Sequence, residues 1–491
     1  MRPKKIVVIG SGFSGLSTAT HLAAAGHSVL VLEKNEVLGG RARKFNANGF
    51  TFDMGPSWYW MPDVFENYFS NFGKKAADYY DLVRLDPSYA VFFGKGDDIK
   101  IPANLDEFKA ELEKLEPGVS EKLDAFLKQA AFKYERGIND LVHRPSLSFM
   151  EFLDFRLFRD VLKMDIFQSM SKHLRKFFTH EKIIRLMEFP VLFLGETAQK
   201  IPALYSLMNY ADIVLGTWYP LGGMHKIIEG MVALAKEKGV VLRNNAEVVA
   251  ISAENSAAKT VKLANGEEIT FDFLVASADY HHVDKNLLAP EYSNYSQKYW
   301  DRRVMAPSSL LFYIGVNKRL KNLQHHNLFF DEPLEPHADA IYTNPRWPEK
   351  PLFYVSAPSV TDPAVAPEGK ENLFVLIPLA PDLKDTEELR NEYFHKVMDR
   401  LEKITGQEIR PHIEYNRSYA HSDFKKDYFA FKGNAYGLAN TLKQTAILKP
   451  TLRNKKLSNL YYTGQLTVPG PGVPPSLISG EVVAKEILKR I

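Results

Sequence analysis

The amino-terminal segment has the order of apolar and small residues expected of a parallel βαβ unit. Apolar residues 6–9 predict a strand, and the small and apolar residues around the glycines at 10, 12 and 15 predict a tight turn followed by a helix. A second apolar run, residues 29–32, predicts the next strand and ends at Glu33. Strands that alternate with helices in this way build a parallel sheet covered by helices.

The rest of the chain continues this mixture, which predicts an α/β fold. Asn265-Gly266 between two apolar runs predicts a hairpin, and Pro117-Gly118 separates two predicted helices. The predicted strands are 89–93, 99–101, 239–242, 245–251, 259–269 (as the hairpin), 273–278, 309–316, 352–356, 372–377 and 459–463, and the predicted helices are 104–116, 120–139, 386–403 and 475–491.

The first turn has the chemistry of a dinucleotide site. Gly10 permits the tight turn, Gly12 lets backbone amides approach a pyrophosphate, and Gly15 lets the helix pack closely on the strand. Glu33 lies 18 residues beyond Gly15, at the end of the second strand, where a carboxylate accepts hydrogen bonds from a ribose diol. The alternative is a tight βα turn that binds no ligand. The complete strand, helix and acid favour the dinucleotide.

Two further segments narrow the cofactor to a flavin. Leu38-Gly39-Gly40-Arg41-Ala42-Arg43 and Phe50-Thr51-Phe52-Asp53-Met54-Gly55-Pro56 resemble the paired-glycine-arginine segment and the D-x-G-P turn of the flavoprotein superfamily that includes amine oxidases and carotenoid desaturases. Glycine brings backbone close to a diphosphate, and arginine adds a planar cation. A surface turn that merely contains an arginine is the alternative.

Nearly the whole chain resembles the bacterial-type phytoene desaturases. Residues 218–224 are similar to the family's aromatic-proline-x-glycine-glycine segment, and residues 357–369 match its A-P-x-x-T-D-x-x-x-A-P-E-G pattern. Residues 459–473 carry the carboxy-terminal signature, with departures at Gln465, Leu466 and Val468. These departures lie where flavin and substrate are expected to meet, so they leave the particular carotenoid and the number of desaturation steps open.

The resemblance implies FAD as the cofactor and assigns residues to it. A strand at Val248 is expected to hold adenine through its backbone, and backbone amides near Val473, where the last helix starts, are expected to stabilise negative charge on reduced flavin. The expected FAD-binding residues are Gly10, Gly12, Ser14, Gly15, Glu33, Lys34, Gly40, Arg41, Gly55, Pro56, Ser57, Val248, Gly464, Gln465 and Val473.

The resemblance also implies how the domains are organised. We expect a Rossmann-like FAD-binding domain assembled from residues 1–78, 217–295 and 448–491. Residues 79–140 and 296–447 are expected to form a sheet-containing substrate domain, and residues 141–216 a helical, membrane-facing subdomain.

Composition limits the partners and the location. The 62 Lys and Arg against 59 Asp and Glu leave no overall basic footprint for nucleic acid. The absence of cysteine excludes disulfides and cysteine metal sites and is compatible with a cytoplasmic location. The apolar start leads into glycines rather than a cleavage site, so we expect no signal peptide. Prolines interrupt the long uncharged stretch 457–480, so we expect no membrane span there.

One segment predicts peripheral contact with a membrane. Residues 146–216 combine many aromatic and aliphatic residues with basic ones, and residues 156–185 contain eight Lys or Arg against three acids. Such a face can lie in the interface of an anionic bilayer, which suits an enzyme whose substrate is a hydrocarbon. The alternative is a helical subdomain whose basic side is only solvated.

The expected chemistry needs an oily channel beside the flavin. A carotenoid precursor offers no charge, so it must bind through apolar area, and Trp58, Tyr59 and Trp60 after the Gly55-Pro56 turn are expected to line the channel. Desaturation removes a hydride to flavin N5 and a proton from the adjacent carbon, and oxygen or a quinone is the expected electron acceptor. The sequence identifies no catalytic side chain. His281-His282 and His325-His326 are expected in extended strands, and no metal site is predicted.

The expected activity is therefore FAD-dependent desaturation of phytoene or a related precursor, toward lycopene. A flavin oxidase or isomerase of another polyene or of an amine is the near alternative. A lipid-binding carrier without catalysis is the other, because prenyl-protein escort factors share this architecture without using flavin.

Overall fold

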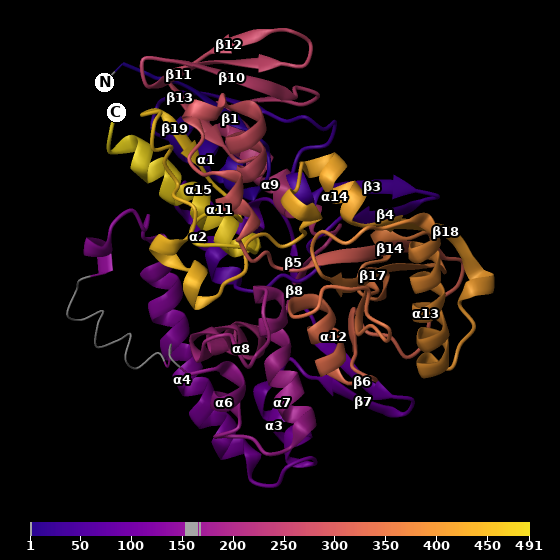
Figure 1. Ribbon diagram of the computed structural model, residues 1–491. Coiled ribbons are helices and arrows are strands. Elements are labelled where there is room, and N and C mark those ends of the chain that lie inside the picture. Colours follow the sequence, from indigo (N-terminus) through magenta and orange to yellow (C-terminus); the bar gives the residue numbers. More distant parts are fainter. Residues whose placement is uncertain (1, 153–164, 166–167) are drawn as a thin grey trace.

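The computed structural model describes residues 2–152, 165 and 168–491 (Figure 1). One of its two large sheets has five strands, and every neighbouring pair of these strands is parallel. The strand order is β19 (Leu460–Tyr462), β13 (Phe273–Ala276), β1 (Lys5–Ile9), β2 (Ser28–Leu32) and β9 (Val241–Arg243). The sheet thus draws its strands from three separated parts of the chain, as predicted.

Helices pack closely on this sheet because small residues lie between them. The elements are α1 (Phe13–Ala24), α2 (Pro62–Ser70), α9 (His225–Glu237) and α15 (Val473–Leu488). A Cβ on Gly480 of α15 would lie 2.4 Å from the carbonyl oxygen of Ser14 on α1. The Thr18 hydroxyl also donates to the carbonyl of Gly480 at 2.9 Å. The first and last helices of the chain, α1 and α15, are therefore in close backbone contact and joined by a hydrogen bond.

Three antiparallel strands extend from the edge of this unit at the top of Figure 1. They are β10 (Val248–Glu254), β11 (Ala257–Leu263) and β12 (Glu268–Thr270), and the turn at Asn265-Gly266 joins the last two as predicted. β10 begins three residues later than the sequence pattern indicated, at Val248.

The second large sheet has seven strands in the order β18 (Ile413–Tyr419), β14 (Ser308–Val316), β17 (Glu371–Leu379), β16 (Phe353–Ser356), β15 (His326–Phe329), β6 (Tyr89–Gly94) and β7 (Asp97–Ile101). β15 and β6 are parallel and the other pairs are antiparallel. α13 (Glu387–Thr405) lies beside it, and the Thr386 hydroxyl caps this helix by accepting from the amide of Leu389 at 3.3 Å.

Shorter elements complete the fold. β3 (Lys44–Ala47) and β4 (Phe50–Asp53) form a hairpin, and β5 (Leu82–Arg84) pairs antiparallel with β8 (Trp218–Pro220) from a distant part of the chain. The short helices are α10 (Tyr280–His282), α11 (Gln297–Asp301), α12 (Leu334–Tyr342) and α14 (His421–Tyr428). The extended conformation expected for His281-His282 is wrong, because Asp279 caps a short helix there by accepting from the amide of His282 at 3.1 Å.

Helices form a layer at the bottom of Figure 1. They are α3 (Leu105–Glu113), α4 (Val119–Asn139), α6 (Met170–Leu174), α7 (Glu181–Glu188) and α8 (Leu207–Ile213). α4 packs along α8, so the helix that precedes residue 141 joins those that follow it. Part of the basic aromatic segment, residues 153–164 and 166–167, lies outside the described residues. No helix within the described ranges is both long and apolar enough to cross a bilayer.

Candidate functional site

A cavity of about 710 Å³ runs between the two sheets and reaches the helical layer. Its walls begin at the turn after β1, pass the Gly55-Pro56 turn, and end among residues of α4, α8 and the loops near them. Of the residues expected to bind FAD, all but Gly15 line this cavity: Gly10, Gly12, Ser14, Glu33, Lys34, Gly40, Arg41, Gly55, Pro56, Ser57, Val248, Gly464, Gln465 and Val473. Gly15 lies behind the wall.

The three glycines of the first turn have three different surroundings. Gly10 has a φ of +99°, which favours glycine. A Cβ on Gly15 would lie 2.1 Å from the carbonyl oxygen of Gly10, so this position sets the approach of helix to strand. A Cβ on Gly12 would meet no atom within 4 Å, because Gly12 borders the cavity. This open space at a helix N-terminus suits a diphosphate.

Glu33 is fixed at the end of β2 by four donors. Ser11 donates its backbone N–H and its hydroxyl to Oε2 at 3.0 and 2.7 Å, and Asn35 donates its backbone and side-chain N–H groups to Oε1 at 3.0 and 2.9 Å. The side chain is only 4% exposed and borders the cavity. These four donors occupy the four lone-pair sites of the carboxylate, so a ribose hydroxyl would have to share an oxygen with one of them or displace it.

Arg41 has a buried donor without a partner in the described part of the chain. Within these residues its Nε makes no hydrogen bond, although Nη2 donates to the carbonyl of Asn434 at 3.4 Å. With its amide oxygen toward Arg41, Gln465 accepts from Nη1 and Nη2 at 3.2 and 3.1 Å. Burial lowers the pKa of Arg41, and the charge of Asp279 acts in the opposite direction. An unpaired cationic donor on the wall of this cavity fits an anionic cofactor such as FAD.

Lys34 and Val248 border the cavity at the end where Glu33 lies. The ammonium of Lys34 lies 3.8 Å from the centre of the Phe429 ring and donates to the carbonyl of Lys426 at 2.8 Å. Phe429 and the backbone at Val248 both line the cavity here, beyond Glu33. This arrangement leaves a flat, partly apolar space where the adenine of a dinucleotide would lie.

The carboxy-terminal signature closes the cavity from the other side. Gly464 has a φ of +106°, and a Cβ there would lie 3.1 Å from the hydroxyl of Ser14. That hydroxyl is within 2.8 Å of the hydroxyl of Ser277. α15 begins at Val473, on the cavity wall. Pro474 and Pro475 have no backbone N–H, and the amide of Ser476 donates to the carbonyl of Gly472 at 3.0 Å, so in this first turn only the amide of Val473 is left for a ligand.

Three segments that carry the family resemblance, which contain Asp53, Gly222 and Asp362, meet behind the Gly55-Pro56 turn. Asp53 accepts from the backbone amides of Met224 and His225 at 2.7 and 2.9 Å, and so caps α9. Asp362 accepts from the amide of Gly222 at 2.6 Å. Neither acid was predicted to have a role, although Asp53 lies in the segment of residues 50–56 and Asp362 in that of residues 357–369. Burial raises the pKa of Asp53 to about 6.

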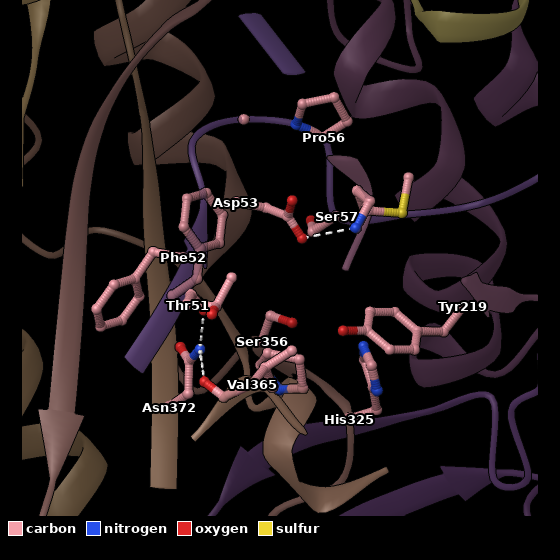
Figure 2. A pocket seen from close by; sticks show the side chains of 14 residues that line it. Thr51, Phe52, Asp53, Pro56, Ser57, Tyr219, His325, Ser356, Val365 and Asn372 are labelled. Atoms are coloured by element: carbon pink, nitrogen blue, oxygen red, sulfur yellow. Dashed lines mark hydrogen bonds between the residues drawn. The ribbon is translucent and has the colours of Figure 1, made fainter. Parts of the chain in front are cut away.

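A second, much smaller cavity of about 20 Å³ lies at this junction (Figure 2). The hydroxyls of Tyr219 and Ser356 point toward one another across it, and Asp53, Ser57 and His325 also line it. It has room for about one water molecule, and its polar lining supplies partners for one. Ser57 borders both cavities and so separates the water-sized space from the large one.

The three aromatic residues after the turn have different positions. Trp58 and Trp60 line the large cavity, and Trp60 Nε1 donates to the hydroxyl of Thr217 at 2.8 Å. The expectation for Tyr59 is wrong: it is 1% exposed, packs on Phe65 with ring centroids 4.3 Å apart, and belongs to a separate apolar cluster beneath α9. Successive residues of an extended segment point to opposite sides, which places Tyr59 away from the channel. The substrate roles of Trp58 and Trp60 stay predictions.

Sequence reasoning missed two polar groups beside this aromatic wall. Asp212 is 3% exposed and accepts from the hydroxyls of Tyr89 and Thr217 at 2.8 and 3.2 Å. His326 is fully buried, and its Nδ1 is 2.6 Å from the hydroxyl of Tyr354. Both contacts join residues far apart in sequence, so no local pattern could have indicated them. Among the described residues, no group of three His, Asp or Glu side chains is arranged to hold a metal ion.

Comparisons with known proteins agree with this geometry. The family described as flavin containing amine oxidoreductase matches residues 13–488. A carotenoid 3,4-desaturase from Haloarcula japonica is 41% identical over 487 residues, covering 99% of this chain and 98% of its own. A zeta-carotene-forming phytoene desaturase from Myxococcus xanthus is 31% identical and covers 99% and 94%. The crystal structure of an oxidoreductase from Methanosarcina mazei has a TM-score of 0.65 at 16% identity, covering 98% and 100%, and supports the fold alone.

Proposed function

Because the chain belongs to the flavin containing amine oxidoreductases, and within them to the carotenoid desaturase family, we propose that it desaturates an acyclic carotenoid, phytoene or a related precursor, toward lycopene. The protein is an FAD-dependent oxidoreductase, and its relatives imply a carotenoid substrate. The proposal concerns which carotenoid it takes and which bond it oxidises.

The observation that carries the proposal is the continuity of the large cavity. The same enclosed space borders Glu33 and Arg41 at one end and the apolar side chains of Ile138, Leu207 and Met208 at the other. A hydrocarbon binds through apolar area removed from water, at about 25 cal/mol per Å². An amine substrate would instead need an acid or an aromatic cage at the flavin.

Bound FAD supplies the acceptor for the hydride that leaves the substrate. The residues of this chain have other tasks. Arg41 and the amides of the first turn bind the anionic cofactor, while Trp58 and Trp60 exclude water and orient the chain of the substrate. Such alignment places one allylic carbon at the flavin and leaves its neighbour to lose a proton.

The location and the electron acceptor belong to the same proposal. We propose that the protein is cytoplasmic and contacts the membrane surface peripherally, through the basic aromatic segment of residues 146–216. Its hydrocarbon substrate is dissolved in lipid, and this segment contains both the aromatic and the basic residues that suit an anionic interface. Oxygen or a quinone then takes the electrons.

The decisive experiment supplies candidate substrates in anionic liposomes. Phytoene, a partly conjugated intermediate and a fully conjugated acyclic carotenoid are each incubated with the FAD-loaded protein, in air and anaerobically with a quinone. We expect longer-wavelength polyene absorption from phytoene. A protein fully loaded with flavin that changes none of these polyenes would overturn the proposal.

A second substrate is favoured by one observation, the 41% identity to a carotenoid 3,4-desaturase. In that case the protein would oxidise the bond near the end of an already conjugated chain. The departures at Gln465, Leu466 and Val468 lie on the cavity wall, where they would distinguish the two substrates. Conversion of the conjugated carotenoid without conversion of phytoene would select this alternative.

A further inference from the structure

Two side chains on neighbouring strands connect the cavity wall to the interior of the second sheet. Tyr354 of β16 lines the large cavity beside Ser57 and Trp58. His326 of β15 lies behind it and is fully buried. The distance between the Tyr354 hydroxyl and His326 Nδ1 is 2.6 Å, a short and direct hydrogen bond.

The other nitrogen of His326, Nε2, is buried and has no hydrogen-bond partner among the residues that the structure describes. The Trp58 ring stacks on the imidazole with centroids 4.1 Å apart at 14°. Burying a polar group without a hydrogen-bond partner is unfavourable, so such a group in a folded protein calls for an explanation, and a functional role is one. The ring that covers His326 is also a ring of the cavity wall.

We propose that Tyr354 and His326 form the relay that accepts the proton lost by the substrate, an inference that rests on the proposed desaturase function. When a hydride has left one carbon, the C–H bond of the adjacent carbon breaks and its electrons form the new double bond. The proton passes to the Tyr354 oxygen while the phenolic proton passes to Nδ1 of His326. The products are the alkene, a neutral tyrosine and an imidazolium.

The protonation states at rest agree with this sequence. Burial lowers the pKa of His326 well below its ordinary value, and His325 acts in the same direction, so the imidazole is neutral at rest and is a weak base. Burial raises the pKa of Tyr354, although the hydroxyls of Ser57 and Ser356 oppose the shift, so the phenol keeps its proton until another arrives. A delocalised polyene cation is a strong acid, so a weak base is sufficient.

The neighbouring groups offer a path away from the site. The ring of His325 lies 4.5 Å from that of His326, and His325 Nδ1 is 2.9 Å from the hydroxyl of the half-buried Thr361. His325 also lines the water-sized cavity with Asp53 and Tyr219. The carboxyl group of Asp53 therefore lies on the lining of the same space as His325.

The first test separates proton loss from hydride loss. Phytoene, or whichever polyene the wild type converts, is prepared with deuterium at one reacting carbon or at the other. In Tyr354→Phe and His326→Gln we expect kcat to fall about 10²-fold with little change in KM, as removal of a general base does. The isotope effect at the proton-losing carbon should rise, and that at the hydride-losing carbon should not.

Two matched variants control for the loss of a buried polar group. Tyr59→Phe removes a hydroxyl that lies 2.9 Å from that of Tyr80, and His337→Gln replaces a buried histidine bonded to the carbonyl of Pro378 at 2.8 Å. Neither residue lines the large cavity, so both isotope effects should stay as in the wild type. FAD content, read from the visible spectrum, should be equal in all four variants.

A second readout does not depend on turnover. In FAD-loaded protein labelled with ¹⁵N-histidine, the His326 signals are those missing from His326→Gln. We expect a neutral ring with the proton on Nε2 and a hydrogen-bonded Nδ1 whose shift changes in Tyr354→Phe. A proton on Nδ1 would overturn the relay.

The outcomes distinguish failure of the relay from failure of the proposed desaturase function. If the wild type converts no polyene, the proposed function fails and the relay fails with it. If the wild type is active and Tyr354→Phe stays within two-fold of it with unchanged isotope effects, only the relay is wrong.

Discussion

Ser11 gives both its backbone N–H and its hydroxyl to one carboxylate oxygen of Glu33, at 3.0 and 2.7 Å. These two hydrogen bonds connect the expected phosphate-binding turn to the acid expected to hold the ribose. Glu33→Gln replaces one acceptor oxygen by an NH₂ group that faces these or the Asn35 donors. We expect the Kd for FAD to rise about 10–100-fold, since a hydrogen bond to a charged group contributes about 1.5–3 kcal/mol.

Titration of the flavin-free protein with FAD, followed by flavin fluorescence, measures this change. Glu36→Gln is the matched control, because Glu36 is exposed and only three residues away. An unchanged Kd in Glu33→Gln would show that the carboxylate serves the turn alone.

An added methyl group should abolish FAD binding at Gly12, whereas at Gly15 it should destabilise the fold. In Gly12→Ala the new Cβ enters open space, and its backbone φ of −71° is ordinary, so the Tm should stay within a few degrees while FAD binding is lost. In Gly15→Ala the Cβ would meet the carbonyl oxygen of Gly10 at 2.1 Å, so the fold itself should be destabilised by several kcal/mol, at least about 3. Thermal unfolding and bound-flavin absorbance, measured on both variants, separate the two effects. Equal loss of Tm in both would contradict the assignment of Gly12 to the ligand.

Arg41 and Arg43 provide a similar contrast. The Nε atoms of both arginines are buried without a partner among the described residues. Arg43 also forms an ion pair with Asp427 at 2.7 Å, whereas Arg41 contacts uncharged groups, the carbonyl of Asn434 and the amide oxygen of Gln465. Arg41→Met should therefore leave the flavin-free protein as stable as the wild type or more so, and weaken FAD binding about 10-fold or more. Arg43→Met should lower the stability of the flavin-free protein, because it leaves Asp427 without its cation. Urea unfolding of both flavin-free variants tests this, and destabilisation by Arg41→Met would count against a ligand-binding role.

The sequence predicted those parts of the site that are local. The turn at residues 10–15, the acid at Glu33 and most strands of both sheets follow from patterns a few residues long, and the structure has them near the expected positions. β18, at one edge of the second sheet, lies where no strand was predicted. The convergence of three separated segments in one sheet came from the family resemblance, because periodicity does not reveal which strands pair.

The polar contacts behind the cavity wall could not be predicted. Tyr89 and Asp212 are bonded across 123 residues, and Asp53 and His225 across 172. Nothing in the residues around Asp212 distinguishes it from an ordinary helix acid. The expectation for Tyr59 is wrong because it places three consecutive aromatic side chains on the channel wall, whereas successive side chains of an extended segment point to opposite sides.

Asp212 gives the protein a pH-dependent stability that one substitution should remove. Burial raises the pKa of Asp212 to about 7, against the effect of the donors Tyr89, Thr217 and Trp60. The folded state then holds a proton that the unfolded state releases near pH 4, so stability is greatest below that pH and falls as the pH rises toward 7. Asp212→Asn imitates the protonated acid and keeps the contacts to Tyr89 and Thr217.

Between pH 4.5 and 7.5, the wild type should therefore lose roughly 3 kcal/mol of unfolding free energy relative to Asp212→Asn, at about 1.36 kcal/mol per pKa unit. Urea denaturation of both proteins at these two pH values measures the difference, and other titrating groups cancel in it. Asp301→Asn is the control, since Asp301 is exposed and should follow the wild type. A wild type and an Asp212→Asn protein that change in parallel with pH would mean that Asp212 stays ionised in the folded protein, held by its three donors.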